Sequence, residues 1–360
     1  MFLFLLNKKQ KKMEQNKPLV AVVIIHWNRK QLLEKFLPAL TKSTYPNLKI
    51  ILADNNSKDR STEWVKQNFP HIQIIKNNEN YGYAGGYNRA LLYVQADYYV
   101  LLNNDVEVTP DWIEPIIDVM ENDKSIAAAQ PKIIDYNNQT LFEYAGAAGG
   151  YMDYLGYAFC RGRIFEKIET DTNQYNSIQK VFWVSGACMF IRSEVFRSLD
   201  GFDEYFFAHM EEIDLCWRMQ LKGYNAVVVP QSKVYHVGGG TLSKQSPYKT
   251  YLNFRNSLIM LTKNLPISTL IWLIPVRSTL DLISSIYFLI NGFPRYSASI
   301  HKAHAQYFFK FSKWWKLREQ NNSVKPIKKL SSVYKRSIVF EHFIKRNSIF
   351  SKLNKKHFNL

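Results

Sequence analysis

Short apolar runs of strand length alternate with amphipathic segments through the first third of the chain. The runs are VAVVIIHW, LKIILAD, IQII and YYVLL, and the segments between them are QLLEKFLPAL, TEWVKQNF and YNRALLYVQ, in which apolar residues recur at helical spacing. Strands that alternate with helices predict an α/β fold, in which a mostly parallel sheet carries helices on both faces.

Polar residues gather where three of these runs end. They are His26, Asn28, Asp54, Asn103, Asn104 and Asp105. Ligands of open α/β sheets bind at the carboxyl ends of the strands, which is where these clusters fall. Buried amides and carboxylates are costly unless they are paired, hydrogen-bonded or bound to a metal. We therefore expect a ligand to meet these side chains.

The pattern is lost over residues 135–180, which are rich in Tyr, Gly and Asn, and it resumes afterwards. VFWVSGACMFI predicts a strand, EEIDLCWRMQLKG predicts a helix that ends at Gly223, and NAVVVP and KVYHV predict two short strands. We expect a domain over residues 18–264, with a first half to about residue 134 and a second half from about residue 135.

A strongly apolar segment, residues 265–294, follows this domain. Its runs PISTLIWLIPV and LISSIYFLI are each too short to span a bilayer, and Arg277 and Asp281 lie between them. Each charge would cost about 2.5 to 3.5 kcal/mol at the bilayer centre. The segment therefore predicts a helical hairpin that lies in a membrane interface; a true span and an ordinary buried helix pair are the alternatives.

The charge is concentrated near the C-terminus. Residues 295–360 contain 16 Lys or Arg residues against two acids, so this basic tail holds +14 of the net charge of +17. A second basic tail, residues 1–17, places MFLFLL before KKQKK, which reverses the charge order of a secretion signal. The C-terminal charge indicates an anionic partner, either a phospholipid surface or nucleic acid.

The remaining composition narrows the class of protein. A hydrophobic content of 46% allows a large core and excludes general disorder. The three cysteines are widely spaced and form no CxxC motif, so neither a disulfide framework nor a zinc cluster is indicated. A reducing, cytoplasmic compartment fits this pattern.

A glycine-rich loop, KNNENYGYAGGYNRA, connects the third and fourth runs. Glycines such as Gly82 and Gly85 allow backbone amides to approach a ligand, and the following helix would point its positive end at a diphosphate. By itself such a loop is more often only a turn. The same holds for Asp54, which can contact a nucleobase or ribose or can form an ordinary Asp-Asn-Asn-Ser turn.

Two further groups suggest catalytic chemistry. Asp105 and His236 each end a strand, and an oxygen ligand with an imidazole suits Mn²⁺ or Mg²⁺ bound to substrate phosphates. Glu211, Glu212 and Asp214 repel one another, which can raise one pKa into the range of a general base. The alternatives are a histidine in a turn and a well-capped helix start.

The order of these motifs resembles the family 2 glycosyltransferases of the GT-A fold, most closely the rhamnosyltransferase-like and galactofuranosyltransferase-like members. The motifs are VVIIHWN, LADNNSKD, NENYGYAGGYNRA, LLNNDVEV, VSGACMFIRSEVFRSLDGFDEYFFAHMEEIDLCWRMQLKGY and VPQSKVYHVGG, between residues 19 and 264. The resemblance implies a nucleotide-diphospho-sugar transferase fold, with nucleotide-binding residues before about 134 and acceptor-binding residues after it.

The resemblance also implies roles for individual residues. Those expected to bind the nucleotide are His26, Asn28, Asp54, Asn80, Gly82, Gly85, Asn103 and Asn104. Asp105 matches the last acid of the family's D-x-D motif, with Asn103 at its first position, and His236 matches a histidine that completes the Mn²⁺ or Mg²⁺ site. Glu212, in place of the family's Asp, matches the catalytic base, with Glu211 or Asp214 able to share that role. Trp183 and Gly186 would line the acceptor side, although Trp183 could equally belong to the core.

The implied activity is an inverting, metal-dependent transfer of a sugar from a nucleoside-diphosphate sugar to a hydroxyl of a glycan acceptor. A glycan on a polyprenyl diphosphate would explain the apolar and basic C-terminal region, which would hold the enzyme at the anionic inner face of the cell membrane. The alternatives are a catalytically inactive relative and a sugar-phosphate nucleotidyltransferase. Nucleic-acid binding is expected to be absent, because no motif of that class accompanies the charge.

Overall fold

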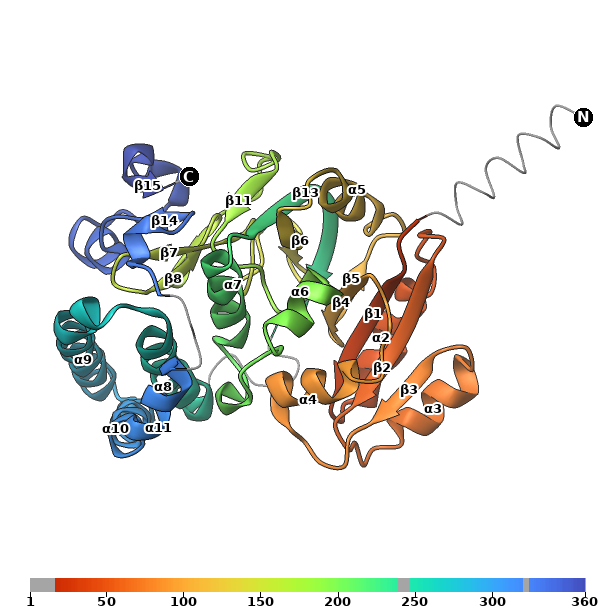
Figure 1. The fold of residues 1–360 in the computed structure, drawn as a ribbon, viewed down its shortest axis with the longest axis horizontal. Helices are drawn as coiled ribbons and strands as arrows, with labels where there is room; N and C mark the ends of the chain where they lie inside the picture. The colour runs from red at the N-terminus through yellow and green to blue at the C-terminus, as the bar shows by residue number, and fades with distance from the viewer. Residues whose placement is uncertain (1–16, 239–245, 320–323, 360) are drawn as a thin grey trace, which may run out of the picture.

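The computed structural model of the protein describes residues 17–238, 246–319 and 324–359. Most of the basic N-terminal tail therefore lies outside the described residues. The predicted alternation of strands and helices in the first third is confirmed (Figure 1). The elements are β1 (Val20–His26), α2 (Lys30–Leu40), β2 (Leu48–Asp54), α3 (Ser61–Asn68), β3 (Gln73–Lys76), α4 (Gly82–Leu91) and β4 (Tyr98–Asn103).

The rest of the domain, from residue 106 onward, adds antiparallel strands to this sheet. Its elements are β5 (Val106–Val108), α5 (Glu114–Asn122), β6 (Ile126–Asp135), β11 (Gln179–Val181), β12 (Cys188–Arg192), α6 (Ser193–Ser198), the 3₁₀ helix η1 (Glu204–Phe206), α7 (Glu211–Leu221) and β13 (Asn225–His236). The strand order is β11-β13-β6-β12-β4-β1-β2-β3, with β5 paired to β13. Because β12 runs antiparallel to both neighbours, the sheet is mixed, with parallel pairing among β1, β2, β3 and β4.

Two of the expected strands differ from the prediction. The run VFWVSGACMFI is divided, because β11 ends at Val181 and β12 begins only at Cys188. NAVVVP and KVYHV instead form one strand, β13, whose pairing with β6 shifts register between Val229 and Lys233. This continuous strand places His236 opposite Val106, the first residue of β5.

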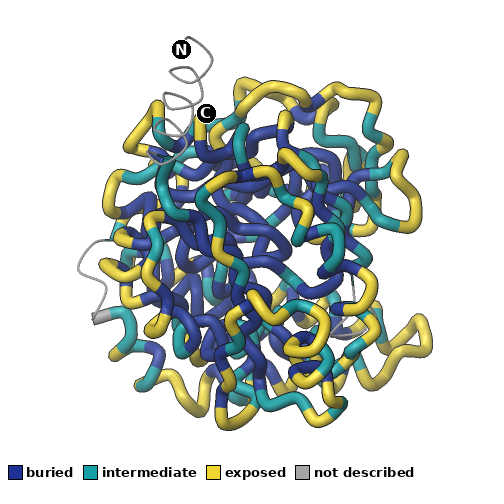
Figure 2. Tube along the Cα trace, turned by 90° about the vertical axis from the view of Figure 1, so that its right-hand side faces the viewer, coloured by how far each residue is buried: buried dark blue, intermediate teal, exposed yellow. Residues whose placement is uncertain are grey.

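Helices cover both faces of the sheet. Successive residues of β1 point to opposite faces and therefore pack against different helices. Val20, Val22 and Ile24 pack into the core formed with α2, α3 and α5, whereas Ala21 and Val23 pack into the core formed with α4 and α7. Such alternation is the two-residue period of a strand. The buried segments run through the centre of the molecule and the exposed ones lie at its periphery (Figure 2).

The segment of residues 135–180, which lacks a clear sequence period, builds most of a second sheet. Its strands are β7 (Gly150–Asp153), β8 (Ala158–Cys160), β9 (Arg163–Ile164) and β10 (Lys167–Ile168). The remaining strands are β14 (Val333–Tyr334) and β15 (Phe358–Asn359), and β14 pairs with β7 in parallel. This part of the basic tail of residues 295–360 is therefore folded into the body of the protein.

In the sequence, a layer of helices lies between the strands β7 to β10 and the strands β14 and β15 of this second sheet. They are α8 (Pro247–Asn264), α9 (Ile267–Ile290), α10 (Pro294–Phe309) and α11 (Phe311–Glu319). The predicted hairpin is wrong, because α9 is one continuous helix of 24 residues. Arg277 and Asp281 interrupt its apolar sequence but face the protein, where both are buried.

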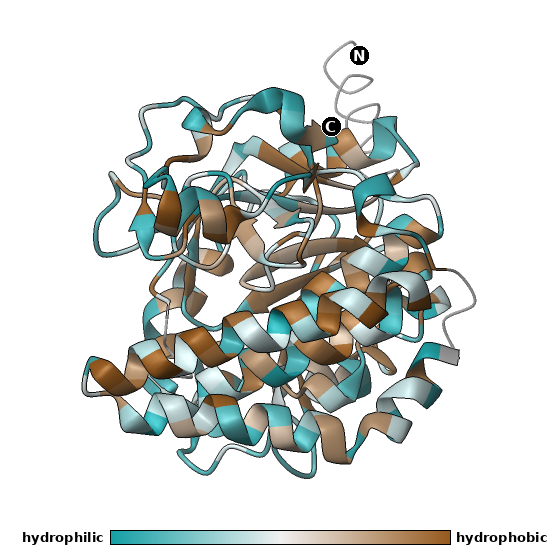
Figure 3. Cartoon of the chain, turned by 90° about the vertical axis from the view of Figure 1, so that its left-hand side faces the viewer, coloured by the Kyte–Doolittle hydropathy of each residue, from teal (hydrophilic) through white to brown (hydrophobic). Residues whose placement is uncertain are grey.

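Contacts within the protein explain why those two charges do not break α9. The Arg277 guanidinium donates to the carbonyls of Leu155 and Gly156, and Asp281 lies 2.9 Å from Nε2 of His304 on α10. Apolar residues, among them Ile271, Ile283 and Ile290, make up much of the outer face of α9, on the side of the molecule that faces the viewer in Figure 3. Within the described part of the chain α9 is the one helix that is long and apolar enough to cross a bilayer, judged by length and composition alone.

Candidate active site

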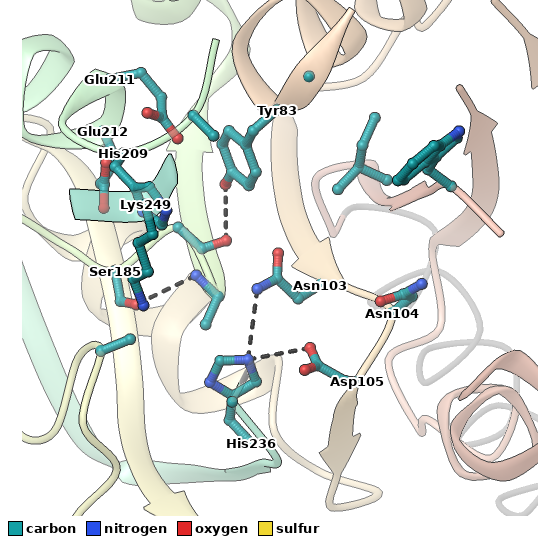
Figure 4. A pocket seen from close by; sticks show the side chains of 18 of the residues that line it. Tyr83, Asn103, Asn104, Asp105, Ser185, His209, Glu211, Glu212, His236 and Lys249 are labelled. Carbon is teal, nitrogen blue, oxygen red and sulfur yellow. Dashed lines mark hydrogen bonds and ion pairs between the residues drawn. The ribbon is translucent and has the colours of Figure 1, made fainter. Parts of the chain in front are cut away.

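A cavity of about 420 Å³ opens at the carboxyl end of the main sheet. It is lined from the ends of β1 and β4, the start of α4, the first turn of α7 and the end of β13 (Figure 4). Ten of the residues singled out from the sequence lie here: His26, Asn80, Gly82, Asn103, Asn104, Asp105, Gly186, Glu211, Glu212 and His236. The topology thus brings together residues separated by up to two hundred positions, as the strand-end rule predicts.

Asp105 and His236 form the centre of one wall. Asp105 lies in the turn between β4 and β5, and the pairing of β13 with β5 places His236 Nε2 3.1 Å from Asp105 Oδ1. On the opposite side of the ring, His236 Nδ1 lies 3.3 Å from Oε1 of Glu143. Burial lowers the pKa of His236, but the carboxylates of Asp105 and Glu143 outweigh burial and raise it to about 10.

This arrangement fits a divalent cation. A histidine that binds a metal through one ring nitrogen commonly donates from the other nitrogen to a carboxylate, and Glu143 occupies that second position. Among the described residues no group of three or more His, Cys, Asp and Glu side chains is arranged so that it could hold a metal ion, so Asp105 and His236 would be the protein ligands and the remaining positions would fall to substrate and water.

His26 and Asn104 meet at the neighbouring strand ends. Asn104 Nδ2 lies 2.9 Å from His26 Nδ1, and His26 Nε2 has no hydrogen-bond partner in the part of the chain that the structure describes. Burial lowers the pKa of His26 to about 4, although Asp54 and Asp59 act in the opposite direction. The ring is therefore neutral at physiological pH and presents one polar nitrogen at the cavity.

The glycine-rich loop enters the cavity at the start of α4. The backbone N–H of Gly82 donates to Asn80 Oδ1 at 3.0 Å, and the hydroxyl of Tyr83 donates to the Gly186 carbonyl at 2.7 Å. Gly82 has a φ of +70°, and a Cβ at this position would lie 2.4 Å from the Phe207 carbonyl oxygen. Only glycine allows this close approach.

Glu211 and Glu212 begin α7 and both line the cavity. Oε2 of each carboxyl group is buried without a hydrogen-bond partner among the described residues. Burial, and for Glu211 also the charge of Glu212, raises the pKa of both groups: that of Glu212 to about 7 and that of Glu211 well above its usual range. An acid with a pKa near 7 is suited to act as a general base.

Asp214 does not belong to this site, and the expectation that it could share the base role is corrected. It is fully buried on the other side of α7, where Arg218, Lys263 and Asn264 contact its carboxylate at 2.8, 3.1 and 2.8 Å. Burial would raise its pKa, but Lys263 and Arg218 lower it below the usual range.

Trp183 is also corrected, because it lies in the core and not on the acceptor side. Its side chain is 4% exposed, its indole N–H donates to the Tyr151 carbonyl at 3.0 Å, and Gly150 leaves room for the ring. It is absent from the cavity lining. Of the two expected acceptor residues, Gly186 alone reaches the cavity.

Three residues expected at the nucleotide lie just behind the cavity wall. Asp54 accepts the backbone N–H of Ser57 at 3.2 Å, and Asn28 accepts that of Lys58 at 2.8 Å. Gly85 packs against Arg89 and Tyr81 within α4. These contacts are turn and helix packing, so a nucleotide role for Asp54, Asn28 and Gly85 stays a prediction.

The sequence did not reveal several residues that line the cavity. They are Trp27, Tyr83, Glu143, His209, Tyr248 and Lys249. Trp27 and Tyr83 follow His26 and Gly82 in the sequence, so they could have been predicted as site residues from these neighbours. Glu143 lies in the segment without a period, and His209 and Lys249 reach the site only through the packing of α7 and α8, so no local signal marked them.

Comparison with known proteins agrees with this geometry. The model of the family "Glycosyl transferase family 2" matches residues 21–200. The N-acetylglucosaminyl-diphospho-decaprenol L-rhamnosyltransferase of Mycobacterium tuberculosis is 27% identical over 233 residues, covering 60% of this chain and 75% of the relative. Rhamnosyltransferase WbbL of Escherichia coli K12 is 24% identical over 225 residues, covering 61% and 83% respectively.

Among solved structures, that of GalNAc-T7 with UDP, GalNAc and Mn²⁺ superposes with a TM-score of 0.60 at 16% sequence identity. The match covers 92% of this chain and 57% of the other, and at that identity it establishes the shared GT-A fold. The family match extends over half of the chain and includes β1 to β6 and β12. The chain belongs to glycosyl transferase family 2, and it is a glycosyltransferase.

Proposed function

We propose that the protein is an inverting, metal-dependent glycosyltransferase that moves a sugar such as rhamnose from a nucleoside-diphosphate sugar to a glycan hydroxyl. The observation that carries this proposal is the pairing of Asp105 with His236 in the same cavity as Glu212. The first two residues would bind the donor's diphosphate through a cation, and the third would activate the acceptor. The two rhamnosyltransferase relatives support the choice of sugar.

Asp105 and His236 would hold Mn²⁺ or Mg²⁺, with Glu143 orienting the imidazole. When bound, such an ion stabilises the charge that develops on the leaving diphosphate. The presence of Mn²⁺ in the GalNAc-T7 structure supports the use of a divalent cation. Asn80, Gly82, His26 and Asn104 would bind the remaining polar atoms of the donor.

Glu212 is the group best placed to take the acceptor's proton. In a single displacement the acceptor oxygen attacks the anomeric carbon, the bond from that carbon to the diphosphate oxygen breaks, and Glu212 receives the hydroxyl proton. The attack comes from the face opposite the leaving group, so the configuration is inverted. No covalent enzyme intermediate is needed.

We further propose a lipid-linked acceptor at the cytoplasmic face of the cell membrane. The name of the Mycobacterium relative specifies a decaprenol-linked sugar diphosphate. In this chain α9 exposes Ile271, Ile283, Tyr287 and Ile290 at 57 to 80% while its polar residues Arg277 and Asp281 are buried. An apolar outer face beside a strongly basic region suits an anionic lipid surface.

The test is the release of nucleoside diphosphate from a panel of UDP-, dTDP- and GDP-sugars, with Mn²⁺, Mg²⁺ or EDTA, in detergent. Metal-dependent release from one donor that is lost in Asp105→Ala, and kept in the exposed control Asp111→Ala, is the expected result. Release of pyrophosphate from a nucleoside triphosphate and a sugar phosphate would indicate a nucleotidyltransferase. Neither release nor nucleotide binding would indicate an inactive relative.

A further inference from the structure

A strained turn precedes the helix that carries Glu212. Phe207, His209 and Met210 have φ values of +63°, +69° and +76°, although none of them is glycine. A non-glycine residue in this region costs of the order of 1 kcal/mol or more and persists only where its surroundings enforce it. The turn connects η1 to α7, so its conformation decides where the first turn of α7 begins.

The side chain of Asn256 of α8 binds to the backbone of this turn. It is fully buried, and its Nδ2 donates to the carbonyls of Phe206, Ala208 and His209 at 2.9, 3.0 and 2.7 Å. Its Oδ1 accepts from the Arg255 guanidinium at 2.9 and 2.7 Å. The two N–H groups of one amide are thus shared among three carbonyls of the turn, those of residues 206, 208 and 209, and a charged neighbour fixes the orientation of the amide.

The same turn contacts the glycine-rich loop. The Phe207 carbonyl accepts the backbone N–H groups of Tyr83 and Ala84 at 2.7 and 3.2 Å, at the start of α4. Phe207, Ala208 and His209 line the cavity together with Gly82. The turn therefore connects the side of the cavity that would receive the donor with the acids of α7.

A second set of contacts holds α7 beyond its first turn. Lys263 and Asn264 of α8 contact the Asp214 carboxylate at 3.1 and 2.8 Å. Loss of Asn256 would leave these contacts in place, so the helix would stay and the turn in front of it would relax. The effect of a substitution is thereby confined to the segment that places Glu211 and Glu212.

We propose that Asn256 is a positioning residue for the transfer reaction: it holds the turn of residues 207–210 so that Glu212 and the glycine-rich loop face one cavity. This inference rests on the proposed function only for its catalytic consequence. The groups on which the charge of Glu212 acts are Glu211 and Cys216 of α7, Tyr83 of α4 and Cys160 of β8, whereas the pKa of Glu212 itself is raised by burial. Burial raises the pKa of Tyr83 and of both cysteines, so these three stay neutral near pH 7.

The test compares Asn256→Ala and Asn256→Asp with Asn253→Ala. Asn256→Asp keeps the volume but removes both N–H donors. Asn253 is on the same helix, is half-buried and makes no side-chain hydrogen bond within the described residues. Hydrogen–deuterium exchange is measured over residues 204–214 and 81–86, and donor turnover is measured as nucleoside diphosphate release between pH 5 and 9.

Both Asn256 variants should exchange faster in these two segments and lose about 100-fold in kcat, since small misplacements of reacting groups cost that much. The acid limb of their pH profile should move to lower pH, because Glu212 gains contact with water. Unchanged exchange and turnover, or a lower rate with an unmoved acid limb, would overturn the inference. If the wild-type protein has no turnover, the proposed function fails, while the exchange measurement still decides the role of Asn256 in the turn.

Discussion

The two carboxyl groups at the start of α7 share one cavity but differ in their proton affinity. Glu212, with a pKa near 7, can be ionised at physiological pH, whereas Glu211 stays protonated because its pKa lies well above the usual range. We therefore expect Glu212→Gln to lower the rate of nucleoside diphosphate release about 10²- to 10⁴-fold. Nucleotide binding, followed by calorimetry, should be retained.

Glu211→Gln is the matched control for that substitution. Glutamine imitates the protonated form of Glu211, so a small effect on the rate is expected. If Glu211→Gln is the more damaging of the two substitutions, Glu211 and not Glu212 is the base.

The raised pKa of Glu212 also predicts the pH dependence of the reaction. A base must be ionised, so activity should be present above pH 7 and should fall about tenfold per pH unit as the pH drops through the pKa of about 7. The measurement is the initial rate of nucleoside diphosphate release at saturating donor and metal. A rate that stays constant down to pH 5 would mean that the base has an ordinary carboxylate pKa.

Glu143 is expected to affect the metal and not the base. Its carboxylate lies 3.3 Å from Nδ1 of His236, so Glu143→Gln should raise the metal concentration needed for half-maximal activity by about 10- to 100-fold. Glu166→Gln, at an exposed position nearby, is the control. An unchanged metal requirement in Glu143→Gln would argue against His236 as a ligand.

At the scale of single elements, α9 has its polar side turned inward. Buried Arg277, Asp281 and Ser285 follow one another at intervals of four residues, and the opposite face is apolar. A helix packed on a soluble surface normally shows the reverse pattern. The outward apolar face is therefore the feature that distinguishes a membrane contact from ordinary packing.

This orientation predicts the effect of a charge on the outer face. Ile290→Glu should lower binding to vesicles that contain anionic lipid about tenfold or more, because burial of one such side chain is worth about 1.5 to 3 kcal/mol. Leu92→Glu, at a site that is 80% exposed like Ile290, should leave binding unchanged. Co-sedimentation with neutral and anionic vesicles measures both. Equal binding by the two variants would exclude α9 as the contact.

Elements could be predicted from the sequence where neighbouring residues determine them. They could not be predicted where contacts between residues far apart in the sequence determine the structure. Apolar runs such as YYVLL became strands because every residue in them is buried in the sheet. In the sequence, Arg277 predicts a break between two apolar runs that the structure joins in α9. Its hydrogen-bond partners are at residues 155, 156 and 257, and the sequence around Arg277 does not reveal them. Glu143 could not be predicted as a site residue for the same reason, because its contact with His236 joins residues far apart in the sequence.

At the scale of the whole molecule, the segment of residues 324–359 holds the second sheet together. Phe350 packs against the rings of Tyr151, Phe159 and Tyr175, with centroids 4.9 to 6.1 Å apart. Removal of residues 266–360 would therefore test folding together with membrane binding. Point substitutions on α9 separate the two.

Phe350→Ala should lower the free energy of unfolding by about 2 kcal/mol, less than the 3–5 kcal/mol typical of a fully buried phenylalanine because the residue is half-buried. Urea unfolding followed by tryptophan fluorescence measures this change. Phe343→Ala, at a site that is 58% exposed, should change it by less than about 0.5 kcal/mol. Equal effects would mean that the C-terminal segment is not part of the cooperative unit.

The pairing of β14 with β7 joins Val333 to Met152, and β14 lies between β7 and β15 in its sheet. A ribosome makes β7 long before it makes β14. During translation the nascent chain must therefore carry an open strand edge at β7 until the residues beyond 333 emerge. Exposed edges invite pairing with other chains, so this interval is when the protein is most in need of a chaperone.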